Sequence, residues 1–507
     1  MNAEIKKKRL SRKDSYKHMT RLGWDTTYQK EEDVYPELDM EGIKIHDWDA
    51  WEDPFRMTME SYWKLQAEKD KKLYAIIDAF AQNNGHQNLT DARYINALKL
   101  FITGVTPVEY YAHRGFAKVA RSFKGEGAAV ACQMQAIDEL RHFQTQMHTM
   151  SHYNKHFDGF GYNVKKFDRI WYLSVPKSMA EDAMTSGPFE WMVAIGFAFE
   201  FVLTSLLFVP FMSGAAYNGD MATVTFGFSA QSDESRHMTL GLQAVKFILE
   251  QDEANVPIIQ KYMEKWLWRG YKMLSLVAMM MDYMLPKSPT SWGEAVDIYI
   301  AQNGVALFKD LEKYGIVAPT DMINTIMAEK DHLSHQLWKT FYNHTVAASM
   351  HIWMPDEKKL NWLSEKYPDT FDEHYRPMWE EFAKHDKGNG QRWYSETLPL
   401  ICNVCQVPAL FTDIEGGKPH VYTHSVSEFK GEKFHFCSDN CKHIFEDEPE
   451  KYSQSWLPPH QIFQGNCGGK DLVPDILNWW KIDHTVDNMD YAGSQDEATW
   501  NNLKNIG

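Results

Sequence analysis

The chain has 507 residues and a mass of 59.0 kDa, enough for about three domains or for one large core with an appendage. Apolar residues make up 44% and charged residues 24%, the balance of a folded globular protein, which excludes a disordered or fibrous chain. The formal net charge of −16 leaves no basic excess to neutralise phosphates, so a nucleic-acid-binding protein is not expected.

The first 56 residues are predicted to form an N-terminal arm. A basic run at residues 6–9, followed by Arg12 and Lys13, is interpreted as a solvated arm or a strap that docks on an acidic surface. No apolar stretch of signal-peptide type follows these charges, so no secretory signal is predicted. Cysteine is sparse, with six in the chain, which favours a reducing cytoplasm and metal-bound or free thiols over disulfides.

Residues 57–395 are predicted to form one large helical domain. Apolar residues recur there at spacings of three and four, and clusters of Gly, Asn and Asp separate the periodic segments. Because no strand-rich region of any size interrupts them, the predicted fold class is mainly α, with a large helical bundle at its centre. The predicted helices span residues 57–84, 90–122, 125–156, 190–217, 220–250, 256–284, 292–314 and 319–350.

The segment 189–217 is apolar and long enough to cross a bilayer. It nevertheless contains Glu190 and Glu200, the mean hydropathy of the chain is −0.49, and the sequence has no second span of this kind. These features predict a helix buried in the centre of a large soluble core and no membrane association. Glu200 then requires a partner, because an unpaired buried carboxylate is strongly destabilising.

Two pentapeptides, residues 138–142 and 233–237, share the pattern D-E-x-R-H. A Glu and a His three residues apart on a helix lie one turn apart on the same face, so both side chains can point at one ion. A further Glu lies about thirty residues before each motif, in the preceding predicted helix. This repeat places six side chains on four helices, the pattern of the dinuclear carboxylate site in ferritin-like bundles: Glu109, Glu139, His142, Glu200, Glu234 and His237.

Charge arithmetic favours metal binding at these residues, because two divalent ions balance four buried carboxylates. Carboxylate and imidazole donors suit iron or manganese. Asp138 and Asp233 are predicted to accept hydrogen bonds from the metal-bound imidazoles, crosswise between the motifs, with Arg141 and Arg236 neutralising them. A single Glu-x-x-His pair is usually an exposed surface pair, and Asp–Arg pairs are often ordinary ion pairs. The repetition of the whole pattern favours the metal centre.

Residues 396–460 are predicted to form a small module of short strands and turns, followed by an irregular tail at 461–507. A C-x2-C pair and a C-x3-C pair in this module predict a structural tetrahedral zinc site formed by Cys402, Cys405, Cys437 and Cys441. Rubredoxin-like iron and four unrelated thiols are the alternatives. The remaining cysteines, Cys132 and Cys467, are predicted to be unattached.

In their D-E-x-R-H contexts, the six residues resemble those of the bacterial multicomponent monooxygenases, the soluble di-iron hydroxylases of methane, alkenes, toluene and phenol. The chain is most similar to the large (alpha) subunit of the phenol hydroxylase branch, whose members end in a YHS-type cysteine module. The resemblance implies that Glu109, Glu139 and His142 hold one iron. It implies that Glu200, Glu234 and His237 hold the other. Two further residues are implied near the site: Thr204, which takes part in proton delivery, and Gln231.

The resemblance implies the oxygenase component of an NADH-dependent phenol 2-monooxygenase, which uses O₂ to convert phenol and related aromatics to catechols. No G-x-G-x-x-G follows a strand, so no flavin or NAD is expected on this chain and electrons must come from a separate reductase. The family implies an FAD and iron–sulfur reductase, a regulatory (effector) protein and smaller hydroxylase subunits in an (αβγ)₂ assembly. An apolar substrate pocket is predicted one turn from the ligands, from side chains that would also suit plain core packing: Val105, Ala112, Phe199 and Phe208.

Three alternatives remain at this point. One is a sister hydroxylase that acts on toluene, benzene or an alkene. Another is a ribonucleotide-reductase small subunit, whose family places a radical-forming tyrosine where this chain has Gln146. The third is a non-enzymatic ferritin-like protein, either an iron store or a structural subunit. The sequence leaves open the natural substrate, the regiochemistry, the identity of the metals, the partner-binding surfaces and the activity of the isolated chain.

Overall fold

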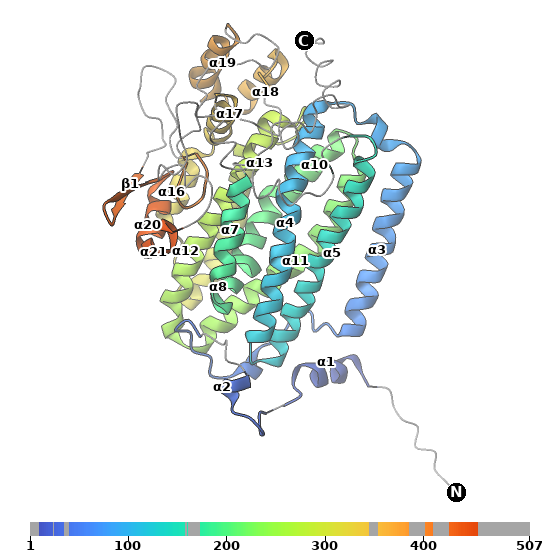
Figure 1. The fold of residues 1–507 in the computed structure, drawn as a ribbon, viewed down its shortest axis with the longest axis vertical. Helices are drawn as coiled ribbons and strands as arrows, with labels where there is room; N and C mark the ends of the chain where they lie inside the picture. The colour runs from blue at the N-terminus through green and yellow to red at the C-terminus, as the bar shows by residue number, and fades with distance from the viewer. Residues whose placement is uncertain are drawn as a thin grey trace.

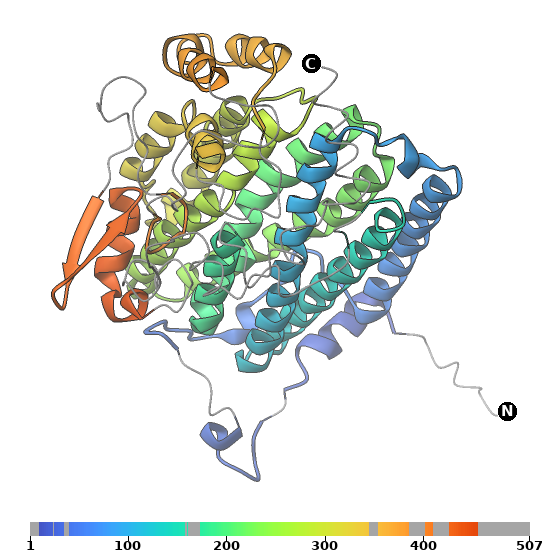
Figure 2. The same cartoon turned by 45° about the horizontal axis from the view of Figure 1, so that its top comes forward.

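The computed structural model describes residues 10–23, 25–34, 40–157, 160, 173–343, 353–384, 401–408 and 425–454. Helices dominate these residues and β1 and β2 are their only strands, which confirms the mainly α fold class (Figures 1 and 2). The basic run at residues 6–9, the predicted helix end at 344–350 and the tail at 461–507 lie outside the described residues.

Helices follow one another along most of the chain, and the two strands come near its C-terminal end. The N-terminal half contains α1 (Arg12–Thr20), α2 (Glu31–Val34), η1 (Trp48–Ala50), α3 (Met59–Gln82), η2 (Gly85–Asn88), α4 (Ala92–Ser122), α5 (Glu126–Tyr153), α7 (Ser174–Thr185), α8 (Pro188–Val193), η4 (Ala194–Phe199), α9 (Glu200–Leu203), η5 (Thr204–Phe208), α10 (Val209–Tyr217) and α11 (Met221–Gln251). The C-terminal half contains η6 (Glu253–Asn255), α12 (Val256–Met273), α13 (Ser275–Met279), η7 (Met280–Met284), α14 (Trp292–Ile298), η8 (Tyr299–Gly304), α15 (Val305–Leu311), η9 (Glu312–Tyr314), α16 (Thr320–Glu329), α17 (Leu333–Asn343), α18 (Glu357–Lys366), η10 (Phe371–Tyr375), α19 (Arg376–Ala383), β1 (Ser425–Phe429), β2 (Glu432–Phe436), α20 (Asp439–Asp447) and α21 (Pro449–Ser453).

The centre of the molecule is a bundle of α4, α5, the continuous run α8–α10 and α11 (Figure 1). Local sequence signals start two of these helices: the Asp91 carboxylate accepts a hydrogen bond from the Arg93 N–H at the start of α4, and Asp220 accepts from the Thr223 N–H at the start of α11. Helix α3 lies at the outer edge of the bundle in both views and buries one narrow stripe of side chains. The four predicted bundle helices therefore exist and lie together.

The predicted helix 190–217 corresponds to Pro188–Tyr217, which is the one described stretch long and apolar enough to cross a membrane by length and composition. In this structure 83% of its most apolar window is buried inside the protein, as the core-helix interpretation requires. The stretch is not a regular α-helix, because π-helical turns η4 and η5 flank the short α segment that begins with Glu200. Hydrophobic periodicity did not predict these turns, since an apolar run has no polar face to reveal an extra residue.

The later predicted helices are subdivided in the structure. Segment 256–284 becomes α12, α13 and the π turn η7, and segment 292–314 becomes α14, η8, α15 and η9. Segment 319–350 breaks between α16 and α17, at residues 330–332. Helix α7 was not predicted, because its early proline and several Ser and Thr residues weaken the helical signal, although proline is tolerated in a first turn.

The C-terminal module contains the predicted short strands, with β1 and β2 paired antiparallel so that Ser425 lies opposite Phe436. It packs directly on the helical domain. The Arg269 guanidinium of α12 donates to the Val404 carbonyl, and the Tyr452 hydroxyl donates to Asp182 of α7 at 2.8 Å. The buried apolar side chains of the module belong to the same continuous core as those of the bundle. The module therefore shares its core with the helices instead of having a separate one.

Gly241 allows the close crossing of α11 and η4. A Cβ atom at this position would lie 1.7 Å from the Gly196 carbonyl oxygen, so an alanine would force two backbones apart. We expect Gly241→Ala to lower the free energy of unfolding by about 3 kcal/mol in urea titrations. Gly304→Ala is the control, because its Cβ would meet only an ordinary contact of 3.6 Å. Equal stability of the two variants would contradict this account of the crossing.

Candidate metal centres

Six acidic and imidazole side chains from α4, α5, α9 and α11 meet in the interior of the bundle, all of them buried. Their donor atoms form two sets, and within each set all atoms lie within 4.8 Å of one another. One set is Glu109, Glu139, His142 and Glu234; the other is Glu139, Glu200, Glu234 and His237. Glu139 and Glu234 belong to both sets, so each could contribute oxygen donors to either one. The structure thus brings together all six residues that the repeated motif singled out.

Both imidazole rings face the carboxylates through Nδ1. The Nδ1 atom of His142 lies 3.0 Å from one oxygen of Glu234 and 3.5 Å from an oxygen of Glu109. The Nδ1 atom of His237 lies 3.0 Å from the other oxygen of Glu234 and 3.3 Å from an oxygen of Glu139. Glu234 therefore presents one carboxylate oxygen to each half of the site.

The carboxyl groups here cannot all ionise without added positive charge. Burial raises the pKa of Glu109 to about 8 and raises the pKa of Glu200 well above its ordinary value. Burial also opposes the ionisation of Glu234, but the facing rings of His142 and His237 bring its pKa below the ordinary range. Among the described residues, Oε2 of Glu200 has no hydrogen-bond partner. Cations bound among these carboxylates would lower the free-energy cost of burying their negative charges.

Asp138 and Asp233 contact the outer nitrogens of the two rings crosswise. The Nε2 atom of His142 lies 3.4 Å from Asp233, and the Nε2 atom of His237 lies 3.2 Å from Asp138. An imidazole whose Nε2–H bonds to a carboxylate has its Nδ1 lone pair free for a metal ion. The contacts therefore have the crosswise pattern expected from the sequence, while the orienting role of the two aspartates stays a prediction.

The arginines of the two motifs lie against these aspartates. A guanidinium nitrogen of Arg141 lies 3.0 Å from Asp138 and 3.4 Å from Asp233, and the same side chain also pairs with Asp70 of α3. Arg236 forms an ion pair with Asp138. Two positive charges therefore face the two buried aspartates, which are almost completely shielded from solvent.

Helix α3 supplies polar contacts that were not predicted from the sequence. The Gln66 amide donates hydrogen bonds to Asp138 at 2.7 Å and to Asp233 at 2.9 Å. The Tyr62 hydroxyl donates to Asp138 at 2.7 Å, and the Lys69 ammonium lies 2.6 Å from Asp233. The signal in the sequence was a set of polar residues at positions i, i+4 and i+7 on one face of an amphipathic helix.

Two buried glutamines of α5 also contact the carboxylates. The Gln146 amide donates to Glu109 at 3.1 Å, and the Gln135 amide lies 3.2 Å from Glu200 and 3.3 Å from Glu139. Gln146 occupies the position where the ribonucleotide-reductase alternative requires a radical-forming tyrosine. An amide at this position can hold a carboxylate in place but cannot take that redox role.

A cavity of about 20 Å³ borders the four glutamates and has otherwise apolar walls. Of the predicted pocket residues, Val105, Ala112 and Phe199 line it, whereas Phe208 is buried elsewhere in the core and does not. A space of this size holds about one water molecule. An aromatic ring can therefore occupy this position only after the lining side chains move.

Thr204 and Gln231 lie near the cluster without lining the cavity. Thr204 begins the π turn η5, directly after the α segment of Glu200, and its hydroxyl has no hydrogen-bond partner among the described residues. Gln231 is half-buried on α11, one turn before Glu234. Their roles in catalysis stay predictions.

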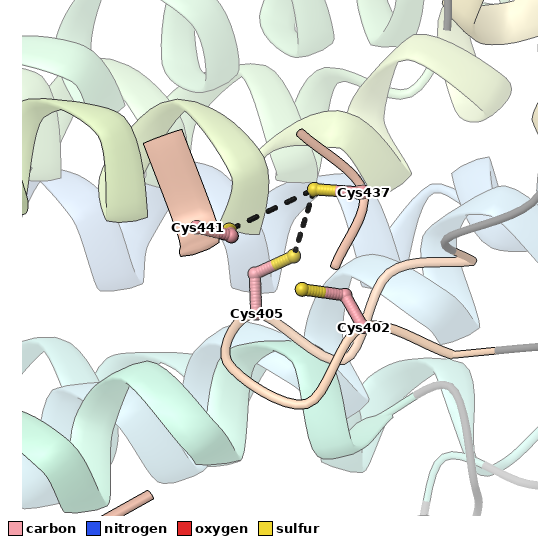
Figure 3. Close-up of side chains that lie close together, drawn as sticks. All are labelled: Cys402, Cys405, Cys437 and Cys441. Carbon is pink, nitrogen blue, oxygen red and sulfur yellow. Dashed lines mark hydrogen bonds between the residues drawn. The ribbon is translucent and has the colours of Figure 1, made fainter. Parts of the chain in front are cut away.

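The four cysteines of the C-terminal module converge in a second cluster (Figure 3). The Sγ atoms of Cys405 and Cys437 are 3.6 Å apart, and those of Cys437 and Cys441 are 3.7 Å apart. Four sulfurs around a tetrahedral zinc ion at about 2.3 Å would be separated by about 3.8 Å. The spacing therefore fits a tetrahedral metal site. Cys132 lies apart as a buried core thiol whose pKa burial raises to about 12, and Cys467 is outside the described residues.

A four-helix bundle with four inward carboxylates and two Glu-x-x-His pairs defines the ferritin-like class of dinuclear carboxylate proteins. The chain matches the methane/phenol/alkene hydroxylase family model over residues 24–252 and a YHS domain over residues 420–456. It is 60% identical to the oxygenase component of phenol 2-monooxygenase from Pseudomonas sp. (strain CF600), over 98% of this chain and 96% of the relative. It is 26% identical to the alpha subunit of the alkene monooxygenase oxygenase component from Xanthobacter autotrophicus, over 93% and 94%.

The solved structure of phenol hydroxylase from Pseudomonas sp. OX1 superposes with a TM-score of 0.88 at 60% identity, covering 97% of this chain and 99% of that one. The chain belongs to the methane/phenol/alkene hydroxylase family. This confirms the predicted family and the prediction of a monooxygenase oxygenase component, in preference to a ribonucleotide-reductase subunit or a non-enzymatic protein. Because such relatives are components of multicomponent systems, further protein components are implied.

The contacts of Gln66 lead to a first test of this site. Replacing it by leucine removes the amide donor shared by Asp138 and Asp233, so we expect Gln66→Leu to lower the free energy of unfolding by about 2 kcal/mol. Lys64→Ala on the exposed face of α3 breaks only a surface ion pair with Glu60 and should change stability by less than about 0.5 kcal/mol. Urea unfolding measures both values, and a loss no larger for Gln66→Leu than for Lys64→Ala would refute the role given to Gln66.

Proposed function

We propose that this chain is the catalytic subunit of a phenol 2-monooxygenase and converts phenol and related aromatics to catechols. One atom of O₂ enters the ring and the other leaves as water, with two electrons supplied from NADH by a separate reductase. The observation that carries the proposal is the convergence of six buried carboxylate and imidazole side chains beside an apolar cavity. The substrate class is supported by 60% identity to a relative that carries this name.

The donor set fits two iron ions. Four carboxylates carry a charge of −4, which two divalent ions cancel, and the orphaned oxygen of Glu200 would gain a partner. Carboxylate and imidazole ligands suit iron, and the two overlapping donor sets provide a place for each ion. When bound, the iron pair would supply the reduction of O₂ and the transfer of one oxygen atom to the ring.

The chain's own residues orient and shield this centre. Glu139 and Glu234, which belong to both donor sets, would help to hold both ions. Asp233 and Asp138 would hold the outer nitrogens of His142 and His237, so that both rings keep Nδ1 directed at the metals. We assign the unpartnered hydroxyl of Thr204 to holding a proton near the site, with Gln231 as a polar neighbour.

The apolar side of the cavity excludes water from the reacting atoms. Val105, Ala112 and Phe199 provide no hydrogen-bonding groups of their own, so the aromatic ring would be held by contact with apolar surfaces. Exclusion of water matters because it prevents side reactions at the site.

The cysteine cluster is proposed to bind one structural zinc. Its four sulfurs are buried, and the Trp268 indole N–H of α12 donates to Cys441 Sγ at 3.1 Å. A zinc ion there would hold residues 401–408 against the β1–β2 hairpin and α20, and through them against the helical domain. We retain residues 396–460 as this structural module, 57–395 as the catalytic domain, 1–56 as the N-terminal arm and 461–507 as the tail.

Substituting one of these cysteines tests the zinc. Cys441→Ser should remove about one zinc per chain and lower the thermal midpoint, because metal binding is coupled to folding of the module. Cys132→Ala removes a buried thiol that lies outside the cluster and should leave zinc unchanged. Elemental analysis of the purified variants measures this, and full zinc content in Cys441→Ser would remove that residue from the ligand set.

The partners follow from the electron requirement and from the family. We propose an (αβγ)₂ hydroxylase with two smaller subunits, a regulatory (effector) protein, and a reductase that carries FAD and an iron–sulfur cluster. No flavin or NAD is assigned to this chain, whose sequence lacks the dinucleotide-binding pattern. Cytoplasmic localisation is proposed because the long apolar helix is buried inside the protein.

The direct test is to supply the assembled hydroxylase with phenol, O₂, NADH and the reductase. We expect two irons and one zinc per chain and catechol as the product, detected by chromatography with ¹⁸O from labelled O₂ in the ring. A fully iron-loaded enzyme that leaves phenol unchanged would overturn the substrate assignment. Oxidation of toluene, benzene or an alkene in its place would identify a sister hydroxylase.

Glu234→Ala tests the site itself. This glutamate belongs to both donor sets, so its loss should abolish turnover by at least about a thousandfold and reduce the iron content, while zinc stays in place. Glu60→Ala, on an exposed part of α3, is the matched control and should keep full activity. Turnover retained by Glu234→Ala would remove this residue from the proposed ligands.

A further inference from the structure

A third group of metal-ligating side chains lies outside both clusters, between α3 and α5. Its members are Asp78 of α3 and His148 and His152 of α5, here called the α3–α5 histidine cluster. The Nε2 atom of His148 and the Nε2 atom of His152 each lie 3.1 Å from the same oxygen of Asp78. One donor atom from each of the three residues lies within 4.8 Å of the others. Neither the repeated motif nor the cysteine pairs predicted this group.

Helix geometry accounts for the convergence. His148 and His152 are four residues apart on α5, so their rings project from the same face one turn apart. Asp78 lies opposite them near the C-terminal end of α3. The exposed fractions of the side chains are 31% for His148, 11% for His152 and 44% for Asp78, so the cluster is open to solvent from one side.

The surroundings of the cluster are rich in imidazole and leave nitrogen atoms without partners. The ring of His86 is fully buried and stacks on His152, with centroids 5.7 Å apart and planes 13° apart. Neither ring nitrogen of His86 has a hydrogen-bond partner among the described residues, and neither does Nδ1 of His152. Beside the cluster, buried ring nitrogens of His86 and His152 thus lack hydrogen bonds from the described side chains.

The distances fit coordination as well as hydrogen bonding. Ligand atoms at about 2.0 Å from a tetrahedral zinc ion are separated by about 3.3 Å, close to the two separations of 3.1 Å in the cluster. An ordinary ion pair needs only one imidazole, whereas here two converge on one carboxylate oxygen. We propose that Asp78, His148 and His152 bind one divalent transition-metal cation of the zinc type, with water completing the coordination.

This cation links two helices that also meet beside the dinuclear centre. Two to three turns before Asp78, helix α3 contributes Gln66, Lys69 and Asp70 to the polar contacts around Asp138, Asp233 and Arg141. α3 lies at the outer edge of the bundle and buries only a narrow stripe. A metal bridge at Asp78 therefore fastens the exposed end of this helix to α5 and limits the movement of its polar stripe.

Zinc binding to the untagged, metal-replete hydroxylase tests the proposal. Equilibrium dialysis against micromolar Zn²⁺, followed by elemental analysis, should show one additional saturable zinc per chain. The double variant His148→Gln/His152→Gln should lose this zinc, and Asp78→Asn should weaken its binding at least tenfold. Iron and the cysteine-bound zinc should stay unchanged in each variant, which separates this site from the proposed function.

His46→Gln is the matched control. His46 forms a comparable surface pair with Asp252, with 2.9 Å between Nε2 and the carboxylate oxygen. No second imidazole from the described residues joins this pair in a metal-ligating group. It should keep the additional zinc. Should the double variant fail to fold, Asp78→Asn decides the question, because its side chain is the most exposed of the three. The absence of additional saturable zinc in the wild type, or equal uptake by wild type and Asp78→Asn, would overturn the proposal.

Discussion

The need to neutralise buried carboxylates dominates the architecture of this protein. Glu109, Glu139, Glu200 and Glu234 point into one interior volume, where burial is the main cause that raises the pKa of Glu109 to about 8. Four ionised carboxylates buried this close together are strongly destabilising unless positive charges lie beside them. A pair of divalent ions would supply that charge, with the two imidazoles as neutral ligands. The arrangement of the bundle helices around this volume, and not any one helix, is what the repeated motif encodes.

A second layer of charge balance surrounds the first. Asp138 and Asp233 lie behind the two imidazole rings and are themselves neutralised by Arg141, Arg236 and Lys69. Each of these two buried aspartates therefore has at least one cationic partner. Helix α3, although it packs at the edge, takes part in this layer through Tyr62, Gln66 and Lys69. Without its amide and ammonium groups, two nearly inaccessible aspartates would lose hydrogen bonds that buried acceptors require.

The sequence predicted most of the bundle and the six converging side chains because both depend on short-range patterns. Helical periodicity places Glu139 beside His142, and the repeat of the motif requires two such pairs to share one interior. The contacts of Gln66 and the docking of Arg269 on the cysteine module join residues far apart in the chain, so no local pattern reveals them. The π turns around Glu200 were hidden for a different reason. In a segment that is apolar on every side, an added residue changes no visible periodicity.

The helical run that contains the π turns η4 and η5 also forms part of the cavity wall. Ile195, Phe199 and Leu203 line the cavity, and they lie on the helical run in which π turns flank Glu200. π turns are rare and occur frequently at functional sites. A cavity of about 20 Å³ holds no aromatic ring, and its wall must therefore rearrange before substrate reaches the glutamates. The same segment thus provides both a carboxylate of the site and part of the pocket wall.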